Sequence, residues 1–342
     1  MGNAVILAEG VYSTTYGKTA NGLIRYSKRY RIVSVIDSKY AGKDAGAVLT
    51  GRNNGIPIIS TLTEARKTGA DTLIVGAATD GGFLPNEYRP FIAEALRSGM
   101  DVVSGLHEFI SDDAEFSKIA GESKSSIIDV RKMFRDRKDP FTGGISEVSA
   151  FRIAVLGTDS AIGKRTTAII LNNQLNAIGR KSVMIGTGQT SWMQGFPYTV
   201  VVDSMINDFI PGGLESVTLE AWRKEKPEFM FIEGQGSVLH PAYPGSFEII
   251  GACRPDAIIL QHAPARHFFD GFESFPIPDL SKYITILELL SDRKVIAISL
   301  NRENLTDSQV EEEILRLEKR YGIPVFDPLG STDKVISRIL AR

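Results

Sequence analysis

The sequence lacks the features of exported and membrane proteins. It contains a single cysteine, Cys253, which cannot form an internal disulfide bond. Its opening residues, MGNAVILAEG, have neither a basic start nor a long apolar core, so they do not read as a signal peptide or a membrane-spanning segment. We therefore expect a cytoplasmic protein with no membrane association.

An excess of charge of either sign is also absent, since 39 Lys and Arg stand against 41 Asp and Glu. Without a net basic field, the composition does not favour binding to nucleic acid or to an anionic membrane. The expected partner is a small-molecule substrate, and association into a homo-oligomer stays open. Hydrophobic residues make up 43% of the 342 residues, which suits two domains with full cores.

Histidine is scarce, and its four residues do not have the spacing of a metal site. His262 and His267 lie five positions apart, which does not place them on one face of a helix, and no cysteine pair supports zinc. The chain also lacks a Gly-x-Ser-x-Gly motif, and Cys253 has no activating neighbour in the sequence. Neither histidine-bound metal nor covalent catalysis is therefore indicated.

A glycine loop near the middle of the chain is the strongest functional signal. The run RIAVLGTDSAIGKRTT reads as a buried strand, a loop and the start of a helix that continues to Ile178. In such a loop, backbone N–H groups, the positive end of the helix and a lysine bind phosphate oxygens together. The residues predicted to bind a phosphorylated cofactor are Gly157, Thr158, Asp159, Ser160, Ala161, Ile162, Gly163, Lys164, Arg165, Thr166 and Thr167.

The loop departs from the usual phosphate-loop pattern in two ways. Five residues, not four, separate Gly157 from Gly163, and Arg165 stands where a hydroxyl normally contacts Mg²⁺. Thr166 or Thr167 would therefore have to supply that hydroxyl. The alternative without a ligand is an ordinary strand–turn–helix corner, in which the glycines only permit close packing.

Three positions further along the chain are candidates for the same site. Glu233 follows the apolar run 229–232, where an acidic residue can hold Mg²⁺ or act as a base. If a Mg-nucleotide binds, Thr166 and Glu233 are the expected metal ligands. Asn301 follows a later strand and could read a base edge, although asparagine is also a common turn residue. His240 is a candidate for proton transfer, although a loop histidine without a catalytic role is the alternative.

The first half of the chain carries a weaker version of the same pattern. A strand over Ala4–Ala8 leads to Gly17-Lys18-Thr19 and a helix, but Tyr12 stands where a glycine would complete the spacing. Asp37 follows the second strand, where a dinucleotide-binding fold holds a ribose, yet the G-x-G-x-x-G fingerprint is missing. We expect a Rossmann-like turn with a solvated Lys18, and nucleotide binding is the alternative.

Strand and helix signals alternate along both halves of the chain, which indicates parallel sheets with helical crossovers. The run RKMFRDRKDPFTGG at 131–144 has no periodicity and ends in turn formers. The fold class is therefore α/β. We expect a Rossmann-like domain over residues 1–145 and a P-loop NTPase-like nucleotide-binding domain, with a mainly parallel sheet, over residues 146–342.

Two resemblances to known families rest on these motifs. The loop GTDSAIGK and the segment EGQG resemble the phosphate loop and the E-G-x-G segment of dethiobiotin synthetase. Over the whole chain, through EGVYSTTYGKTANGL, VIDSKYAGKDAG, GTGQT and EGQGSVLHPAYPG, the sequence resembles a bacterial two-domain family formerly of unknown function. A branch of that family is assigned as D-glutamate N-acetyltransferase, which uses acetyl-CoA.

The resemblances and the loop lead to one expected function and two alternatives. The expected function is acetyl-CoA-dependent N-acetylation of an acidic amino acid such as D-glutamate. An arginine would clamp the carboxylate of the acceptor, and Arg254 and Arg266 are candidates. The alternatives are an ATP- and Mg²⁺-dependent ligase or kinase similar to dethiobiotin synthetase, and a nucleotide-dependent switch without enzymatic activity.

The expected function gives each part of the site a role. Lys164 would hold the pyrophosphate of coenzyme A and Arg165 its 3′-phosphate, unless Arg165 lies on the outer face of the helix and contacts only water. Either Glu233 or His240 would remove the proton from the acceptor ammonium. The loop at 186–192, which follows the next strand, should lie beside the phosphates.

Overall fold

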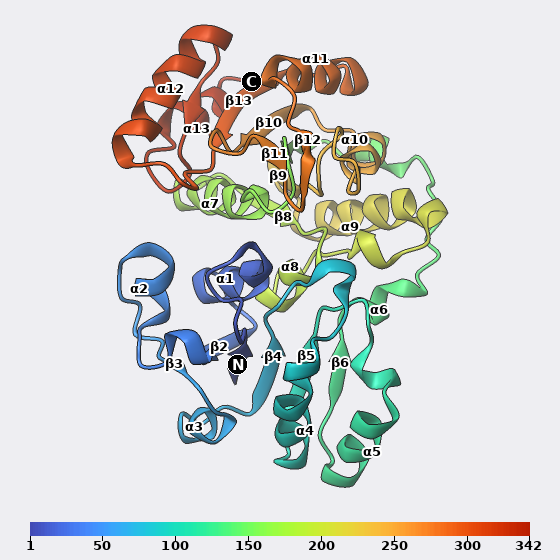
Figure 1. Ribbon diagram of the computed structural model, residues 1–342. Helices are drawn as coiled ribbons and strands as arrows, with labels where there is room; N and C mark the ends of the chain where they lie inside the picture. Colours follow the sequence, from blue (N-terminus) through green and yellow to red (C-terminus); the bar gives the residue numbers. More distant parts are fainter. The chain divides into compact units, whose positions relative to one another are not determined.

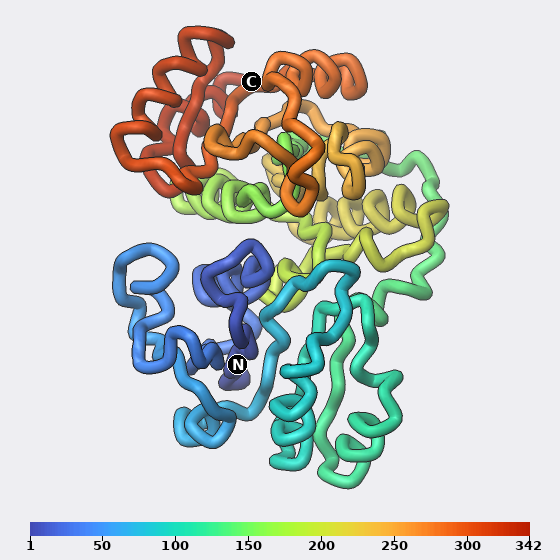
Figure 2. The backbone as a smooth tube through the Cα atoms, in the orientation of Figure 1, coloured from blue at the N-terminus to red at the C-terminus, as the bar shows by residue number.

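The computed structural model describes residues 1–342 and divides the chain into two compact units. The N-terminal unit comprises Met1–Asp136 together with Gln189–Pro197. The C-terminal unit comprises Arg137–Gly188 together with Tyr198–Arg342. Figure 1 labels the elements and Figure 2 traces the path of the chain. The break falls inside the aperiodic run at 131–144, and a short segment from the second half of the sequence belongs to the N-terminal unit.

The N-terminal unit is built on a six-stranded sheet in the order β3-β2-β1-β4-β5-β6, in which all strand pairs are parallel. This is the strand order of a Rossmann-like fold, as predicted. The strands are β1 (Gly2–Leu7), β2 (Tyr30–Ile36), β3 (Ile58–Ile59), β4 (Thr72–Val75), β5 (Asp101–Ser104) and β6 (Ile127–Asp129). The helices are α1 (Lys18–Arg25), α2 (Ala45–Thr50), α3 (Leu62–Lys67), α4 (Arg89–Arg97), α5 (Ala114–Ser123), α6 (Lys132–Arg135) and α8 (Gln189–Gln194).

Strand β1 buries both of its faces, and this explains its continuous apolar run. Val5 belongs to a core cluster that also contains Ile92 of α4. Ile6 points to the opposite face, where it lies with Ala20 of α1 close to the backbone of Gly76. A strand covered on both faces needs apolar residues at successive positions rather than at alternate ones.

The C-terminal unit contains a second six-stranded sheet, in the order β14-β13-β10-β7-β9-β8, and its strand pairs are also parallel. A separate antiparallel hairpin, β11–β12, follows β10. The strands are β7 (Phe151–Gly157), β8 (Ser182–Ile185), β9 (Phe229–Glu233), β10 (Ala257–His262), β11 (Phe268–Phe269), β12 (Phe272–Pro276), β13 (Val295–Leu300) and β14 (Val325–Phe326). The helices are α7 (Lys164–Ala177), α9 (Ile210–Glu225), α10 (Ser246–Cys253), α11 (Leu280–Ser291), α12 (Asp307–Tyr321) and α13 (Asp333–Leu340).

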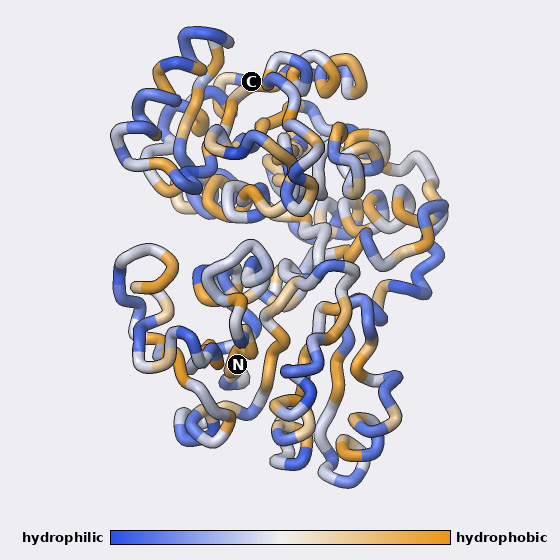
Figure 3. The backbone as a smooth tube through the Cα atoms, viewed as in Figure 1, coloured by the Kyte–Doolittle hydropathy of each residue, from blue (hydrophilic) through white to orange (hydrophobic).

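The helices of this unit are amphipathic to different degrees. Helix α12 alternates between hydrophilic and hydrophobic colours in Figure 3, and only Val310 and Leu317 are buried along its length. Helix α7 buries residues on several of its sides, which suits a helix that packs within the unit. No helix of the chain combines the length and the apolar composition needed to cross a lipid bilayer.

The segment that enters the C-terminal unit is held by a buried carboxylate on α9. The Glu215 side chain accepts hydrogen bonds from the backbone N–H groups of Thr142 (2.5 Å) and Ile145 (3.0 Å). Burial alone would raise the pKa of Glu215, but these donors hold it below the usual range. The carboxylate therefore stays ionised and fixes a stretch that has no periodic pattern of its own.

Candidate functional site

The phosphate loop, Gly157–Gly163, lies at the carboxyl end of β7, a strand that has β10 and β9 as its neighbours. Gly163 adopts a φ of 97°, in the left-handed region that favours glycine, and α7 starts at the next residue. No side chain caps α7, and its first turn contains no acidic residue. The backbone N–H groups of Ala161, Ile162 and Gly163 donate to no acceptor within the protein. The loop therefore presents free donors and a positive helix end, which is what an anion requires.

Lys164 crosses the loop with an almost completely buried side chain. Its Nζ donates to the backbone oxygen of Asp159 at 2.6 Å. A side chain on Gly157 or on Gly234 would come within 2.9 Å of the lysine stem. These two glycines therefore leave the passage through which Lys164 reaches the loop.

The base of the loop is fixed by β10. The N–H of Thr158 donates to the carbonyl oxygen of Gln261 at 3.0 Å, and its hydroxyl lies 3.1 Å from Nδ1 of His262. Tyr283 of α11 donates its hydroxyl to the Thr158 carbonyl oxygen at 2.9 Å. Thr167 donates its buried hydroxyl to Oε1 of Gln261 at 2.6 Å. The loop therefore keeps its shape through contacts on the protein side.

Asn301 also supports the loop from the protein side. Its Nδ2 donates to the carbonyl oxygen of Ile162 at 2.8 Å, and its Oδ1 accepts the N–H of Glu303 at 2.8 Å. Both ends of the amide are thus engaged. This geometry favours loop support over the predicted reading of a base edge.

Asp159, the third residue of the loop, is a fully buried carboxylate. It accepts the N–H of Ser160 at 2.7 Å, Nη1 of Arg266 at 2.9 Å and the N–H of Asp270 at 3.1 Å. Nε2 of His240 lies 3.3 Å from its Oδ1. Burial alone would raise the pKa of Asp159, but the contacts from His240 and Arg266 hold it below the usual range. Asp159 therefore anchors the turn of the β11–β12 hairpin to the loop as an ionised group.

His240 supports Asp159 and is closed off from solvent. Its Nδ1 accepts the N–H groups of Ala242 and Tyr243, both at 3.1 Å, so the ring proton lies on Nε2 and faces Asp159. The rings of Tyr243 and Phe269 pack against the imidazole with centroids at 4.8 and 5.0 Å. This geometry favours a supporting role for His240 over direct proton transfer.

Glu233 ends β9 and pairs with Arg165, with 3.3 Å between Oε1 and Nη1. The second carboxylate oxygen accepts the N–H of Thr187 at 3.0 Å, and the Glu233 carbonyl oxygen accepts the Thr187 hydroxyl at 2.9 Å. Only 20% of the Arg165 side chain is exposed. The alternative in which Arg165 contacts only water is therefore wrong.

These residues do not fit the usual Mg²⁺ arrangement of a phosphate loop. Arg165 occupies the hydroxyl position, and its guanidinium contacts the acid that would be the second ligand. The Thr167 hydroxyl donates to Gln261 instead, and Thr166 makes no side-chain hydrogen bond. The chain contains no group of three or more His, Cys, Asp or Glu side chains arranged to hold a metal ion. The loop itself, by contrast, offers backbone N–H donors and a lysine to a phosphate group.

The structure separates the two arginines proposed as carboxylate clamps. Arg254 precedes β10 and lies at the amino end of that parallel strand, so it is not part of a site at the carboxyl ends. Arg266 follows β10 and donates from Nη1 to Asp159 and to the Ser160 carbonyl oxygen, at 2.9 and 3.0 Å. Its other side contacts Glu303 at 2.8 Å. Sequence patterns could not reveal these contacts, because they join residues far apart in the chain.

The segment predicted as one loop at 186–192 is divided between the two units. Thr187 donates its N–H to Glu233 at the carboxyl end of β9. Gln189–Gln194, however, forms α8 and belongs to the N-terminal unit, so the prediction of a loop there is wrong.

The N-terminal Gly-Lys loop differs from a phosphate site. Tyr12 is fully buried, donates its N–H to Asp37 at 3.1 Å and its hydroxyl to the Ala45 carbonyl oxygen at 2.9 Å. The N–H of Ala20 in the first turn of α1 donates to the carbonyl oxygen of Gly76 at 3.1 Å. Asp37 also caps the short helical turn that begins at residue 38. The Gly76 carbonyl oxygen thus takes one of the N–H donors at the start of α1 that a phosphate would use.

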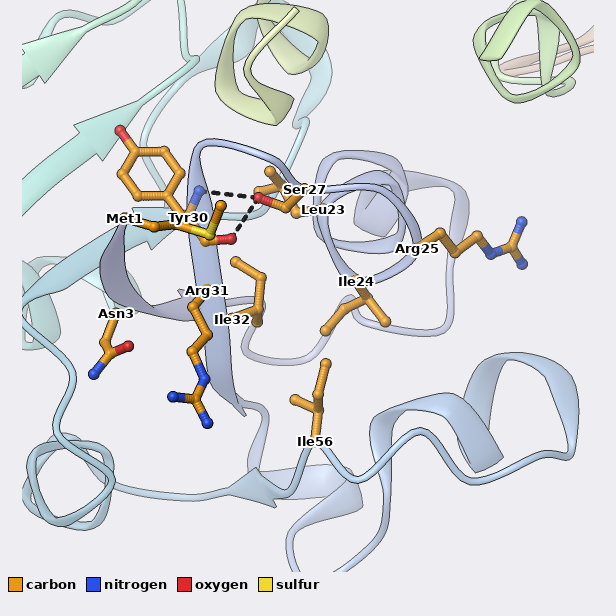
Figure 4. Close-up of a pocket in the computed structure, with 10 residues that line it drawn as sticks. All are labelled: Met1, Asn3, Leu23, Ile24, Arg25, Ser27, Tyr30, Arg31, Ile32 and Ile56. Atoms are coloured by element: carbon orange, nitrogen blue, oxygen red, sulfur yellow. Dashed lines mark hydrogen bonds between the residues drawn. The ribbon is translucent and has the colours of Figure 1, made fainter. Parts of the chain in front are cut away.

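One hollow of the N-terminal unit, of about 410 Å³, opens at the amino ends of β1 and β2 and is lined by Asn3, Ile24, Arg25 and Arg31 among others (Figure 4). Open α/β sheets bind ligands at the carboxyl ends of their strands, so this hollow lies at the opposite edge from the expected position.

Known proteins share both the sequence and the fold. The chain is 31% identical to the "D-glutamate N-acetyltransferase" of Tritonibacter scottomollicae, over 81% of this chain and 83% of that protein. It is 30% identical to the protein of the same name from a Pseudoalteromonas species, over 82% and 84%. A crystal structure of a DUF1611 family protein from Anabaena variabilis ATCC 29413 superposes with a TM-score of 0.92, at 28% identity and with full coverage of both chains.

Two family patterns match along the chain. Residues 38–133 match "Domain of unknown function (DUF1611_N) Rossmann-like domain". Residues 139–336, more than half of the chain, match "Domain of unknown function (DUF1611_C) P-loop domain". With its Rossmann-like and P-loop domains, the chain belongs to the DUF1611 family.

Proposed function

We propose that this protein transfers the acetyl group of acetyl-CoA to the amino group of an acidic amino acid, with D-glutamate as the first candidate. The observation that carries the proposal is the phosphate loop, with its free N–H groups at 161–163 and Lys164. The chain that carries this loop is similar to proteins named D-glutamate N-acetyltransferase. Neither observation alone would identify both the cofactor and the acceptor.

Coenzyme A suits the loop because its pyrophosphate needs several donors and a positive charge. The N–H groups of Ala161, Ile162 and Gly163 can bind the phosphate oxygens, and Lys164 can neutralise them. Arg165 lies in the same helical turn and adds a second cation for the 3′-phosphate. Acetyl-CoA supplies a thioester, whose carbonyl carbon an amine can attack.

The transfer requires that a proton leave the acceptor. The amino nitrogen forms a bond to the carbonyl carbon, the carbon–sulfur bond breaks, and the leaving thiolate takes a second proton from the nitrogen and is released as the thiol of coenzyme A. The acceptor ammonium must first lose a proton, because only the free amine has a lone pair. Of the two predicted bases, both buried, Glu233 lies at the carboxyl end of β9 beside Arg165 of the loop, whereas Nε2 of His240 faces Asp159. We therefore propose Glu233 as the proton acceptor and His240 as the residue that holds Asp159.

The proposal is tested by thiol release. The purified protein is incubated with acetyl-CoA and one of D-glutamate, L-glutamate or D-aspartate, and free thiol and acetylated product are quantified. Thiol release that depends on an acidic amino acid is the expected result. In parallel, ADP release from ATP with a carboxylate substrate would identify a ligase or kinase. Binding of a nucleotide without turnover in either assay would instead indicate a switch.

A further inference from the structure

Two positions that hold a divalent cation in most phosphate loops are joined here by an ion pair. In the usual arrangement a hydroxyl follows the lysine, and an acid lies at the end of a neighbouring strand. Arg165 takes the first position and Glu233 the second, with 3.3 Å between Nη1 and Oε1. The exposed fractions of the two side chains are 20% and 4%. The negative charge of Glu233 is therefore neutralised by an arginine of the protein, at a position where most phosphate loops use a bound cation.

The orientation of Glu233 is fixed by its other contacts. Thr187 donates its N–H to Oε2 and its hydroxyl to the Glu233 carbonyl oxygen. Gln235 donates Nε2 to the Thr187 hydroxyl at 3.0 Å. A side chain at Gly188 would come within 2.9 Å of Gln235 Nε2, so the glycine keeps this network intact. One carboxylate oxygen is thus directed toward Arg165.

Arg165 has N–H donors that remain available to a ligand. Only its Nη1 contacts Glu233, and its Nε and Nη2 donate to no group of the protein. A guanidinium can bind phosphate oxygens through several N–H groups at once and needs no shell of oxygen ligands. A magnesium ion, in contrast, needs near-octahedral oxygen coordination.

We propose that the guanidinium of Arg165 takes the place of the divalent cation, so that the loop binds a phosphorylated cofactor without metal. The ligand class follows from the charges. Arg165 and Lys164 attract a phosphate group that carries no metal ion. The Mg²⁺ of a Mg-nucleotide would instead be repelled by the positive charge of Arg165. Coenzyme A belongs to the first class. This inference rests on the proposed function only in requiring that phosphates bind at this loop.

The test is equilibrium binding of coenzyme A and of ATP, measured by titration calorimetry in EDTA and again in millimolar MgCl₂. We expect the wild-type protein to bind coenzyme A with the same affinity in both buffers, and ATP more weakly when Mg²⁺ is present. Arg165→Thr should bind coenzyme A about tenfold more weakly in EDTA, since a charge-assisted contact is lost. Mg²⁺ should restore part of that loss, because the new hydroxyl and Glu233 can then hold the ion.

Two further variants control the measurement. Arg180→Thr removes another Arg–Glu pair of the same unit, Arg180–Glu228 at 2.6 Å. This pair lies at the amino ends of β8 and β9, whereas the phosphate loop lies at the carboxyl end of β7. Arg180→Thr should leave both affinities unchanged. Arg165→Lys keeps a cation at the position and should retain coenzyme A binding in EDTA. This variant provides the measurement if Arg165→Thr fails to fold.

Each contrary outcome has a distinct meaning. If wild-type coenzyme A binding disappears in EDTA and returns with Mg²⁺, the inference is overturned while the phosphate loop stands. The same holds if Arg165→Thr binds like the wild type in EDTA. If neither coenzyme A nor ATP binds in any buffer, no phosphate binds at this loop, and the proposed function falls with the inference.

Discussion

Lys164 is the central residue of the proposed phosphate site. Its Nζ lies 2.6 Å from a loop carbonyl, and its stem fills a passage bordered by glycines. We predict that Lys164→Ala weakens coenzyme A binding by about ten- to a hundredfold, since one charge-assisted contact is lost. Calorimetry measures the effect, and a melting curve without ligand checks the fold.

The matched control for Lys164 is the other lysine that follows a glycine at the start of a helix. Lys18 begins α1, after a loop that contains the buried Tyr12. Lys18→Ala should leave coenzyme A binding unchanged. If Lys18→Ala were the more damaging of the two, the cofactor would belong to the N-terminal unit.

His240 and Glu233 can be separated by measuring binding and turnover independently. Glu233→Gln should lower turnover by about a hundredfold or more while coenzyme A still binds, because a proton acceptor is lost. His240→Ala should weaken coenzyme A binding instead, because Asp159 loses a neighbour that fixes the loop. Equal loss of turnover with unchanged binding in both variants would contradict a supporting role for His240.

We predict that His262 makes the stability of the folded protein depend on pH. Its Nδ1 lies 3.1 Å from the Thr158 hydroxyl, and burial lowers the pKa of the imidazole to about 4. Asp279, Glu313 and Arg316 are the charged groups that act on it, with smaller effects than burial. Because the folded pKa lies below the ordinary 6.5, the unfolded chain takes up this proton more readily. Stability is therefore complete above about pH 6.5 and falls as the pH drops toward 4.

The expected size follows from the two pKa values. Between pH 7 and pH 5 the free energy of unfolding should fall by about 2 kcal/mol through His262. Carboxylates with lowered pKa, such as Asp159, lose their contribution only at lower pH. Urea unfolding at the two pH values measures the change, and His262→Asn should lack this part of it. A wild-type protein as stable at pH 5 as at pH 7 would contradict the prediction.

At the scale of elements, α8 joins a distant part of the sequence to the N-terminal unit. The guanidinium of Arg29 lies 3.9 Å from the centroid of the Trp192 ring, and its Nε donates to the Trp192 carbonyl oxygen at 2.9 Å. The Lys28 N–H donates to the Gln194 carbonyl oxygen at 2.8 Å, and Gln194 Nε2 to Gly22 at 2.8 Å. These contacts account for a helix of six residues that would not persist alone.

Trp192→Ala should therefore destabilise the N-terminal unit by roughly 2 kcal/mol, through lost packing and the lost cation–π contact. Hydrogen exchange measured by region should show faster exchange in β1 and β2, with β7 and β10 unchanged. The chain contains one other tryptophan, Trp222, which belongs to α9 of the C-terminal unit and lies under Lys226 at 4.7 Å. Trp222→Ala should produce the opposite pattern, and identical patterns would refute the assignment of α8.

What the sequence predicts at this scale depends on how local the signal is. The strand, loop and helix from β7 to α7 follow from neighbouring residues, and the structure confirms them. Helix α8 and the β11–β12 hairpin owe their place to partners that no local pattern contains. Arg266 reaches Asp159 across 107 positions, so its contact with the loop could not be foreseen. The apolar run 229–232, in contrast, is a local signal. It predicts a buried strand that leads to Glu233, and β9 does end at this residue.

At the scale of the whole molecule, each unit has its own parallel sheet, as the alternating strands and helices predict. Parallel strands bring their carboxyl ends to one edge, so the loops that follow β7, β9, β10 and β13 meet there although the sequence separates them. The residues proposed for the cofactor site of the C-terminal unit lie at this edge. In the N-terminal unit, Tyr12 and Asp37 use the corresponding edge for structural contacts.

The assignment of residues 189–197 to the N-terminal unit has a consequence for synthesis of the chain. The unit's first segment ends at Asp136, and its last residue, Pro197, follows 61 positions later (197 − 136). At about 5 to 20 residues per second, the ribosome needs roughly 3 to 12 s to cover that distance. During this interval the nascent N-terminal sheet lacks Trp192 and its contact with Arg29. By the time it acquires them, β7 and the phosphate loop have already been synthesised, whereas β9 and β10, the neighbours of β7, have not, so the first part of the C-terminal unit waits for its sheet while the N-terminal unit is completed.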